Sequence, residues 1–291
     1  KTLGTTQIYY SGGGEPFTHP DILRILTLSK RLGFVTSVNT NFTLVNQEIL
    51  HTLCRIGVDH LTISVWAGTV KSYLATHPNK NESDFMRLEQ NLTYLNHIKT
   101  GPPYTKVYHV LSKANFHEFM EMFYFARNTS SDSVEYTLID IIPGKTDSLL
   151  LDRKDLMELK KQALKLKNLY ESRHELKRQI VLFGYADFLR RIDDIPNASS
   201  GYYDQGLVKN LPCTIGWTFS RINADGEVNG CLKSHKIPVG NIFKQSFSEI
   251  WNSPAQKEFR RHTLAMKSLD PYLRQIGNDS RCDKGCRKTC D

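Results

Sequence analysis

The chain has 291 residues, of which 40% are hydrophobic and 23% are charged, a composition that excludes a disordered protein. No apolar run approaches the ~20 residues that a membrane-spanning helix needs, so we expect no membrane partner. The net charge of +8 is spread thinly over short basic pairs, which are typical of solvated helix faces. We therefore do not expect a nucleic-acid partner either.

The first residue is Lys1, and a strand pattern follows directly without a methionine or a basic-then-apolar leader. We interpret the sequence as lacking its true N-terminal segment. The preference for metal-bound thiols over disulfides, argued below, leads us to predict a cytoplasmic location.

Residues 1–142 alternate between two patterns. Segments rich in Val, Ile, Tyr or Thr predict strands at 6–11, 34–40, 60–65, 104–111 and 134–142. Apolar stripes with a 3.6-residue period predict helices at 19–32, 46–56, 84–98 and 115–127. The last of these helices starts at Asn115 with Glu118 three residues later, which predicts a capping box.

Five strands that alternate with four helices predict an α/β fold with a parallel sheet and right-handed crossovers. Because the first element is already a strand, we expect a partial (β/α) barrel that lacks its first strand–helix unit. Such a fold binds its ligand at the carboxyl ends of the strands.

The rest of the chain has a different character. Residues 152–195 are charged and helical in pattern, and the Pro- and Ser-rich residues 196–212 resemble a linker. A β-hairpin over Thr218–Asn223 and Glu227–Leu232 is predicted by its Asp225-Gly226 turn. We therefore divide the chain into a core (1–150), a helical connector (151–205) and a small α+β, cysteine-containing extension (206–291).

The segment Gly12–Pro16 follows the first predicted strand. Glycines at a strand end allow the backbone to approach a ligand closely, because no side chain intervenes. The Glu15 carboxylate beside them could accept hydrogen bonds from an ammonium group. The segment alone would also suit an ordinary turn between a strand and a helix.

Five of the six cysteines lie in the last third of the chain. Cys213 and Cys231 form C-x12-G-x4-C around Gly226, and the end of the chain reads C-x3-C-x3-C at Cys282, Cys286 and Cys290. Clustered thiolates suit iron–sulfur clusters, which need four of them, but also zinc. Three disulfides are a further alternative, which we disfavour because disulfide frameworks mostly stabilise small secreted domains. The remaining cysteine, Cys54, shares an apolar helix face and is predicted to be a core residue.

The motif Gly13-Gly14-Glu15-Pro16 resembles the Gly-Gly-Glu-Pro motif of the radical S-adenosylmethionine superfamily, which contacts the amino group of the methionine moiety. The resemblance continues through "SVNTNFT" and "LTISVWAGT". It implies that S-adenosylmethionine is bound by Gly13, Gly14, Glu15, Pro16, Thr40, Asn41 and Ser64. Trp66 departs from the pattern, because many relatives have an acidic residue there.

The cysteine-containing extension, with "VGNIFKQSFSEIWNSPAQKEFR", resembles the SPASM/twitch extension of that superfamily. The resemblance implies one auxiliary [4Fe–4S] cluster held by four of the five late cysteines, and leaves open which of the last three is surplus. In contrast to the family, no C-x3-C-x2-C loop for the catalytic [4Fe–4S] cluster lies between Lys1 and Cys213. We expect this loop upstream of Lys1, so that the chain alone is inactive.

The resemblance implies a radical enzyme that cleaves S-adenosylmethionine reductively and abstracts hydrogen from a small-molecule, peptide or sugar-derived substrate. It also implies an electron donor such as flavodoxin or ferredoxin. The sequence singles out no catalytic residue. Two alternatives stay open, namely a non-catalytic iron–sulfur or electron-transfer protein and a zinc-bearing binding module.

Overall fold

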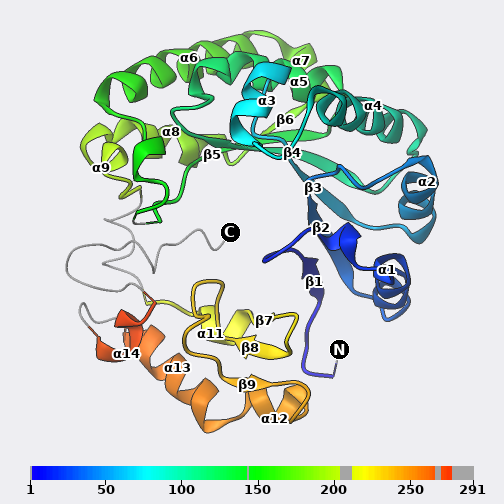
Figure 1. Ribbon diagram of the computed structural model, residues 1–291, viewed down its shortest axis with the longest axis vertical. Coiled ribbons are helices and arrows are strands. Elements are labelled where there is room, and N and C mark those ends of the chain that lie inside the picture. Colours follow the sequence, from blue (N-terminus) through cyan, green and yellow to red (C-terminus); the bar gives the residue numbers. More distant parts are fainter. Residues whose placement is uncertain (1, 143, 204–211, 266–269, 277–291) are drawn as a thin grey trace. The chain divides into compact units, whose positions relative to one another are not determined.

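The computed structural model forms two compact units, Lys1–Ser199 and Ser200–Asp291 (Figure 1). The structure describes residues 2–142, 144–203, 212–265 and 270–276. Each unit has a sheet of its own. None of the helices in this described part of the chain has both the length and the apolar surface needed to cross a bilayer.

The first unit is built on one parallel sheet with sequential strand order β1 to β6. The predicted α/β class with parallel strands is therefore confirmed. The strands are β1 (Gln7–Tyr10), β2 (Val35–Thr40), β3 (His60–Ser64), β4 (Tyr104–Leu111), β5 (Ser133–Leu138) and β6 (Val181–Phe183).

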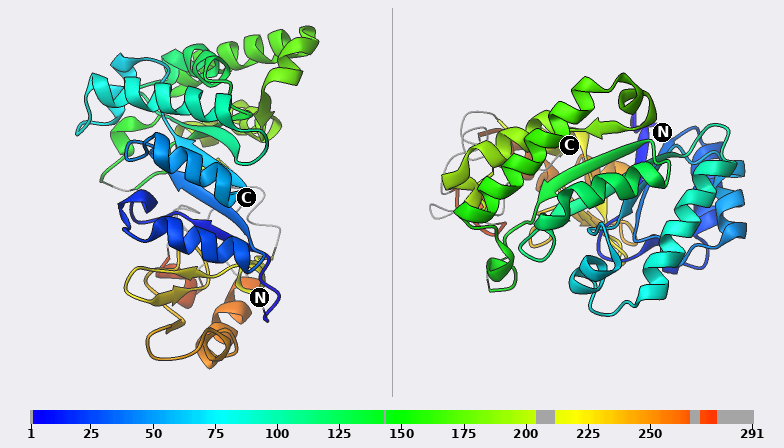
Figure 2. Two further views of the ribbon diagram at one scale, coloured as in Figure 1. Left: turned by 90° about the vertical axis from the view of Figure 1, so that its right-hand side faces the viewer. Right: turned by 90° about the horizontal axis from the view of Figure 1, so that it is seen from above.

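Helices follow the strands and lie along the outer face of the curved sheet, so that the other face is concave (Figures 1 and 2). The first four are α1 (Ile22–Arg31), α2 (Gln47–Ile56), α3 (Val70–Thr76) and α4 (Glu82–Ile98). The later ones are α5 (Phe119–Asn128), α6 (Arg153–Ser172), α7 (His174–Gln179), α8 (Tyr185–Asp193) and α9 (Ile195–Ser199). Single 3-10 turns occur at Pro16–Thr18, Phe116–Glu118 and Asp147–Leu149.

The two faces of the sheet differ in chemistry because side chains alternate along each strand. In β4, Thr105, Val107, His109 and Leu111 are buried, whereas the alternate side chains from Tyr104 onward are only half-buried. The buried set belongs to the core with fully buried apolar side chains of the neighbouring strands and of the helices. Each such side chain stabilises the fold by about 1.5–3 kcal/mol. The concave face is consequently the polar one.

Two elements of the first unit differ from the sequence prediction. Residues 152–195 are not helical throughout, because β6 pairs in parallel with β5. A run of three apolar residues cannot be told from a helix segment by periodicity, which explains the error. Helix α3 was not predicted, and its capping box at Thr69 and Ser72 identifies its start.

The predicted capping box at Asn115 and Glu118 is wrong, because both side chains make tertiary contacts instead. The Asn115 amide donates to the carbonyl oxygen of Trp66 at 2.8 Å and of Val110 at 2.9 Å. The Glu118 carboxylate accepts a 2.8 Å hydrogen bond from Thr69 and another from Ser72. These contacts fix the loop after β3 to the start of α5.

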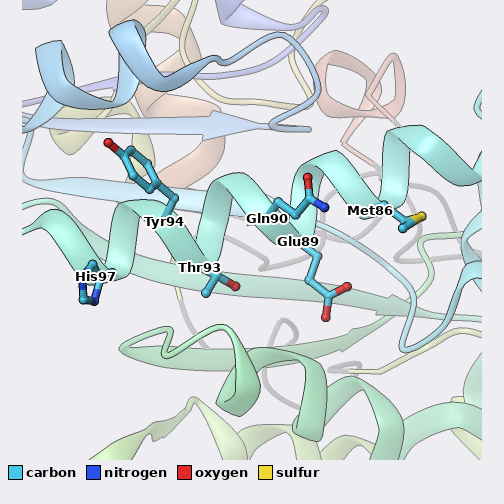
Figure 3. A pocket seen from close by; sticks show the side chains of 6 residues that line it. All are labelled: Met86, Glu89, Gln90, Thr93, Tyr94 and His97. Carbon is cyan, nitrogen blue, oxygen red and sulfur yellow. The ribbon is translucent and has the colours of Figure 1, made fainter.

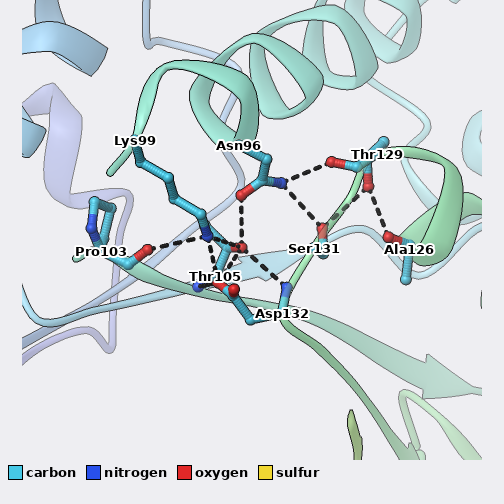
Figure 4. A network of polar contacts seen from close by, with 8 residues as sticks. All are labelled: Asn96, Lys99, Pro103, Thr105, Ala126, Thr129, Ser131 and Asp132. Atoms are coloured by element: carbon cyan, nitrogen blue, oxygen red, sulfur yellow. Dashed lines mark hydrogen bonds and ion pairs between the residues drawn. The ribbon is translucent and has the colours of Figure 1, made fainter. Parts of the chain in front are cut away.

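The amino edge of the sheet contains the same polar arrangement twice. In the second copy, Asp132 accepts hydrogen bonds from the backbone N–H of Thr105 at 2.6 Å, from the Thr105 hydroxyl at 2.8 Å and from Lys99 (Figure 4). In the first copy, Asp59 accepts from the Thr36 N–H at 2.7 Å, from its hydroxyl at 3.1 Å and from Lys30 at 2.6 Å. We call these two groups the amino-edge clamps.

The hydrogen bonds of the first clamp lower the pKa of Asp59. Although burial raises the pKa of this carboxyl, the hydrogen bonds from Lys30 and Thr36 hold the pKa below its usual value. The first clamp joins the end of α1, the start of β2 and the residue before β3. The second clamp joins the end of α4, the start of β4 and the residue before β5. The amino edge is therefore a fixed base for the opposite, carboxyl edge.

The second unit has a three-stranded antiparallel sheet of order β7-β8-β9, with helices on it. The predicted hairpin exists, although it is shorter than expected, and Thr218 belongs to a helix instead. Its elements are α11 (Ile215–Thr218), β7 (Arg221–Ile222), β8 (Glu227–Asn229), β9 (Gly240–Asn241), α12 (Phe247–Trp251), α13 (Pro254–Ala265) and α14 (Pro271–Arg274). The hairpin turns at Gly226, whose φ of 79° favours glycine.

We expect acid to destabilise the first unit through His109, which is fully buried and stacks on Tyr136 with ring centroids 5.6 Å apart. Burial lowers the pKa of His109 to about 3, against about 6.5 in an unfolded chain. Between these two pKa values, His109 is therefore protonated in the unfolded state and neutral in the folded state. The free energy of unfolding should fall by about 1.4 kcal/mol per pH unit between about pH 6.5 and 3.

Urea unfolding of the wild type and His109→Phe between pH 7.5 and 4.5 measures this contribution. The variant should lose that part of the slope, and the exposed His117→Gln should keep it. Equal slopes in all three proteins would contradict the assignment to His109.

Candidate functional site

A cavity of ≈ 310 Å³ opens at the carboxyl edge of the first three strands. Of the residues predicted to bind a cofactor, the structure brings five together around it: Gly14, Glu15, Thr40, Asn41 and Ser64. Gly13 and Pro16 flank the cavity in sequence without lining it. Gly12, from the segment that was expected to approach a ligand, also lines the cavity, whereas Ser11 and Asn39 were not singled out from the sequence. The alternation along β2 could have indicated Asn39, which lies on the concave face.

Gly14 lines this cavity without a side chain of its own. Its N–H donates to the carbonyl oxygen of Gly12 at 2.7 Å, which closes a tight turn, and Gly12 has a φ of 112°. A methyl group added at Gly14 would meet no protein atom within 4 Å. The position beside Gly14 is thus open space at the cavity.

The Glu15 carboxylate is occupied by the protein itself. One oxygen accepts from the Thr40 hydroxyl at 2.7 Å and from the Phe17 N–H at 3.2 Å, and the other accepts from the Asn41 N–H at 2.7 Å. These bonds fix the loop after β1 to the end of β2. In this structure Glu15 therefore shapes the cavity, and its predicted contact with an ammonium group stays a prediction.

Each of the three loops at the cavity contains a residue in the left-handed conformation two positions after its strand. These residues are Gly12, Phe42 with a φ of 61°, and Trp66 with a φ of 54°. Bulky residues adopt this conformation only where their surroundings hold them there, and such positions concentrate at functional sites. The Trp66 ring packs against His77, centroid to centroid 5.7 Å, and burial lowers the pKa of His77.

In the second unit, Cys213 and Cys231 lie on segments that contact the same side chain. Methyl groups added at Gly216 and Gly230 would lie 3.1 and 2.5 Å from the ring of Phe259 in α13. Gly216 follows Cys213 by three residues, and Gly230 precedes Cys231. The Cys213 N–H also donates to the carbonyl oxygen of Thr263, 3.1 Å away, in α13.

The predicted third group of ligands, Cys282, Cys286 and Cys290, lies outside the described residues. Among the residues that the structure describes, no three His, Cys, Asp or Glu side chains gather as a metal site. Cys54 is half-buried in α2, and burial raises the pKa of its thiol, as for a thiol in apolar surroundings.

Comparison with known proteins shows which proteins the chain resembles. Residues 213–290 match the SPASM family, described as an iron–sulfur cluster-binding domain. The chain is also 25% identical over 270 residues to a PqqA peptide cyclase of Gluconobacter oxydans, covering 89% of this chain and 66% of that protein. An AdoMet-dependent heme synthase of Methanosarcina barkeri is 25% identical over 251 residues, 83% of this chain and 67% of that protein.

These similarities support a radical S-adenosylmethionine protein with a SPASM domain over residues 213–290. The fold agrees with that of anSMEcpe with bound AdoMet, with a TM-score of 0.62 and 16% identity over 97% of this chain and 74% of that one. SuiB of Streptococcus suis gives a TM-score of 0.60 and 17% identity over 88% of this chain and 57% of that one. The chain thus spans about two thirds of the length of the curated relatives above.

The concave face of the first unit continues from the cavity into a polar wall. The strand register places Ser64 beside Tyr108, Tyr108 beside Glu135 and Glu135 beside Phe183. Lys106 forms an ion pair with Glu135 at 2.5 Å and lies 4.3 Å from the centre of the Phe183 ring. Burial, together with the Glu135 charge, raises the pKa of Tyr108 to about 12, so that the phenol stays protonated.

A second hollow of ≈ 510 Å³ runs along α4. Its lining residues all come from this one helix, as Figure 3 shows: Met86, Glu89, Gln90, Thr93, Tyr94 and His97. None of them follows a strand. The hollow is therefore not part of the carboxyl-edge site.

Proposed function

We propose that the chain provides the S-adenosylmethionine pocket and the auxiliary-cluster domain of a radical enzyme that abstracts hydrogen from a peptide. The observation that supports this proposal most strongly is the carboxyl-edge cavity with its opening at Gly14. It lies where parallel α/β folds bind ligands, at the ends of consecutive strands.

The residues around the cavity suit the methionine end of S-adenosylmethionine. An ammonium group needs acceptors, which backbone carbonyl groups of the Gly12–Gly14 turn and the side-chain oxygen of Asn39 can offer. A carboxylate needs donors, such as the Ser64 hydroxyl. In this proposal Gly13 and Gly14 contact the ligand, whereas Glu15, Pro16, Thr40 and Asn41 hold the shape of the wall.

When bound, S-adenosylmethionine and the cluster that reduces it supply the radical chemistry. The chain itself binds and orients the cofactor and excludes water from the concave face. Since no C-x3-C-x2-C loop lies between Lys1 and Cys213, we expect the chain alone not to cleave S-adenosylmethionine. A flavodoxin or ferredoxin would donate the electron to the complete enzyme.

A peptide is the proposed substrate for two reasons. One relative is named a PqqA peptide cyclase, and one SuiB structure contains the precursor peptide SuiA. On this chain, the Lys106–Glu135 pair places a donor and an acceptor side by side on the concave wall without net charge. An amide group, which also has one acceptor and one donor side, is complementary to such a pair.

Four of the five late cysteines would hold one auxiliary [4Fe–4S] cluster, with Cys213 and Cys231 among them and the other two drawn from Cys282, Cys286 and Cys290. Anaerobic reconstitution followed by iron, sulfide and zinc analysis tests this assignment. About four iron and four sulfide per chain are expected for one such cluster. Zinc without sulfide would instead identify a zinc module.

Gly14→Ala tests the cofactor pocket. The added methyl group meets no protein atom, so the thermal midpoint should not change, but it occupies ligand space and should weaken S-adenosylmethionine binding at least tenfold. Gly101→Ala is the matched control, because its methyl group also meets nothing within 4 Å and Gly101 lies outside the cavity.

Isothermal titration calorimetry with S-adenosylmethionine on both variants measures the dissociation constants. Equal affinity for wild type and Gly14→Ala would show that the cofactor does not bind at this edge.

A further inference from the structure

Among the described residues of the second unit, Arg260 is a half-buried cation without an anionic partner. Arg260 in α13 is half-buried, and no carboxylate lies within 4.0 Å of its guanidinium among the residues that the structure describes. Its Nη2 atom is buried without a hydrogen-bond partner in that same part of the chain. The next two residues differ, since Arg261 lies 3.9 Å from Glu258 and His262 lies 2.7 Å from Asp270.

The Arg260 guanidinium is held in place from two sides. Its Nε atom donates to the carbonyl oxygen of Gly216 at 2.9 Å, and its centre lies 4.4 Å from the centre of the Trp251 ring. The Trp217 ring lies 5.9 Å from it. A guanidinium that is fixed by a carbonyl group and by an aromatic face is an ordered charge and not a solvated one.

This ordered charge adjoins the segments that contain the cysteines. Gly216 belongs to the segment after Cys213, and the ring of Phe259, the residue before Arg260, contacts both Gly216 and Gly230. Thr263, one turn further along α13, accepts the hydrogen bond from the Cys213 N–H. Helix α13 therefore contacts the segments of both cysteines, through Arg260 and Phe259 at Gly216 and through Phe259 at Gly230.

A partly buried cation without an anion is destabilising, and the buried Nη2 group without a hydrogen-bond partner adds to that cost. A cluster bound by four thiolates is anionic and accepts N–H donors at its sulfur atoms. We propose that Arg260 is a positioning and tuning residue for the auxiliary iron–sulfur cluster, donating from its guanidinium and raising the reduction potential. This inference depends on the auxiliary cluster proposed above.

The direction of the effect follows from charge. Reduction adds one electron to an anionic cluster, so a nearby positive charge stabilises the reduced form more than the oxidised form. Removing the charge should lower the midpoint potential. We expect the ratio of reduced to oxidised cluster at a fixed potential to fall about tenfold, which corresponds to about 59 mV for one electron.

The test is a potentiometric titration of the reconstituted chain, monitored by electron paramagnetic resonance. Arg260→Gln and Arg260→Met remove the charge, Arg260→Lys keeps a charge without the planar fork, and Arg261→Gln is the exposed control next in sequence. The neutral variants should titrate at lower potential than the wild type, with Arg260→Lys between them and Arg261→Gln unchanged. Equal midpoints for Arg260→Gln, Arg261→Gln and the wild type, at equal iron content, would overturn the proposal.

Two other outcomes also decide the question. If the neutral variants stay folded by circular dichroism but lose iron that Arg260→Lys keeps, the charge belongs to the cluster and the proposal stands. If all three Arg260 variants lose helical signal together with iron, Arg260 has only a structural role. A wild type that takes up no iron and sulfide would instead refute the proposed cluster itself.

Discussion

Phe259→Ala should unfold or loosen the second unit and prevent it from loading iron. The Phe259 side chain is fully buried and packs in a core with Val228, Cys231 and Ile250. Truncation of a buried phenylalanine costs about 3–5 kcal/mol, because the transfer free energy is lost and a cavity remains. The same ring spaces the two segments that contain Cys213 and Cys231, so their separation should lose its definition.

Phe243→Ala is the matched control, since the Phe243 side chain is 75% exposed. Thermal unfolding followed by near-ultraviolet circular dichroism, with iron and sulfide analysis after reconstitution, separates the two variants. Phe259→Ala should lose stability and iron, and Phe243→Ala should keep both. Full iron loading of Phe259→Ala would show that this ring does not organise the cysteines.

Glu15→Gln should weaken S-adenosylmethionine binding without a direct contact to the ligand. The substitution replaces a charged acceptor of three hydrogen bonds by an amide, one side of which is a donor that cannot serve the Asn41 N–H or the Phe17 N–H. Hydrogen bonds to charged groups contribute about 1.5–3 kcal/mol each. We expect the binding free energy of S-adenosylmethionine to become weaker by about 2–3 kcal/mol. Most of this change should arise because the loop after β1 becomes less ordered.

The exposed Glu48→Gln provides the comparison. Calorimetric titration with S-adenosylmethionine should give a dissociation constant raised more than tenfold for Glu15→Gln and unchanged for Glu48→Gln. If Glu15→Gln binds like the wild type, the hydrogen bonds to Thr40 and Asn41 do not shape the pocket.

The fold of the first unit was predictable wherever hydrophobic periodicity was long enough to identify an element. The expected strand over 104–111 coincides with β4, and Asn46 and Gly57 cap α2 as their types indicate. The three residues of β6 were too few to show a period. Neither amino-edge clamp was predictable, because each joins residues more than 20 positions apart whose side chains are common on surfaces.

The candidate site was partly predictable for a different reason. Gly14 and Ser64 belong to two separate local motifs, and parallel strands bring their carboxyl ends to one edge of the sheet. The left-handed conformations of Phe42 and Trp66 have no local signal, since neither residue type favours them. The intramolecular partners of Glu15 were not predictable, because Thr40 and Asn41 become its neighbours only in the folded sheet.

The doubled clamp at Asp59 and Asp132 bears on how this scaffold can diversify. Both clamps hold the sheet together at its amino edge, opposite the candidate cavity. Their hydrogen bonds involve no residue of the carboxyl-edge loops. Exchange of carboxyl-edge loops between homologues should therefore leave the register of the parallel strands unchanged. The carboxyl-edge loops can therefore change in evolution while the two amino-edge clamps keep the sheet intact.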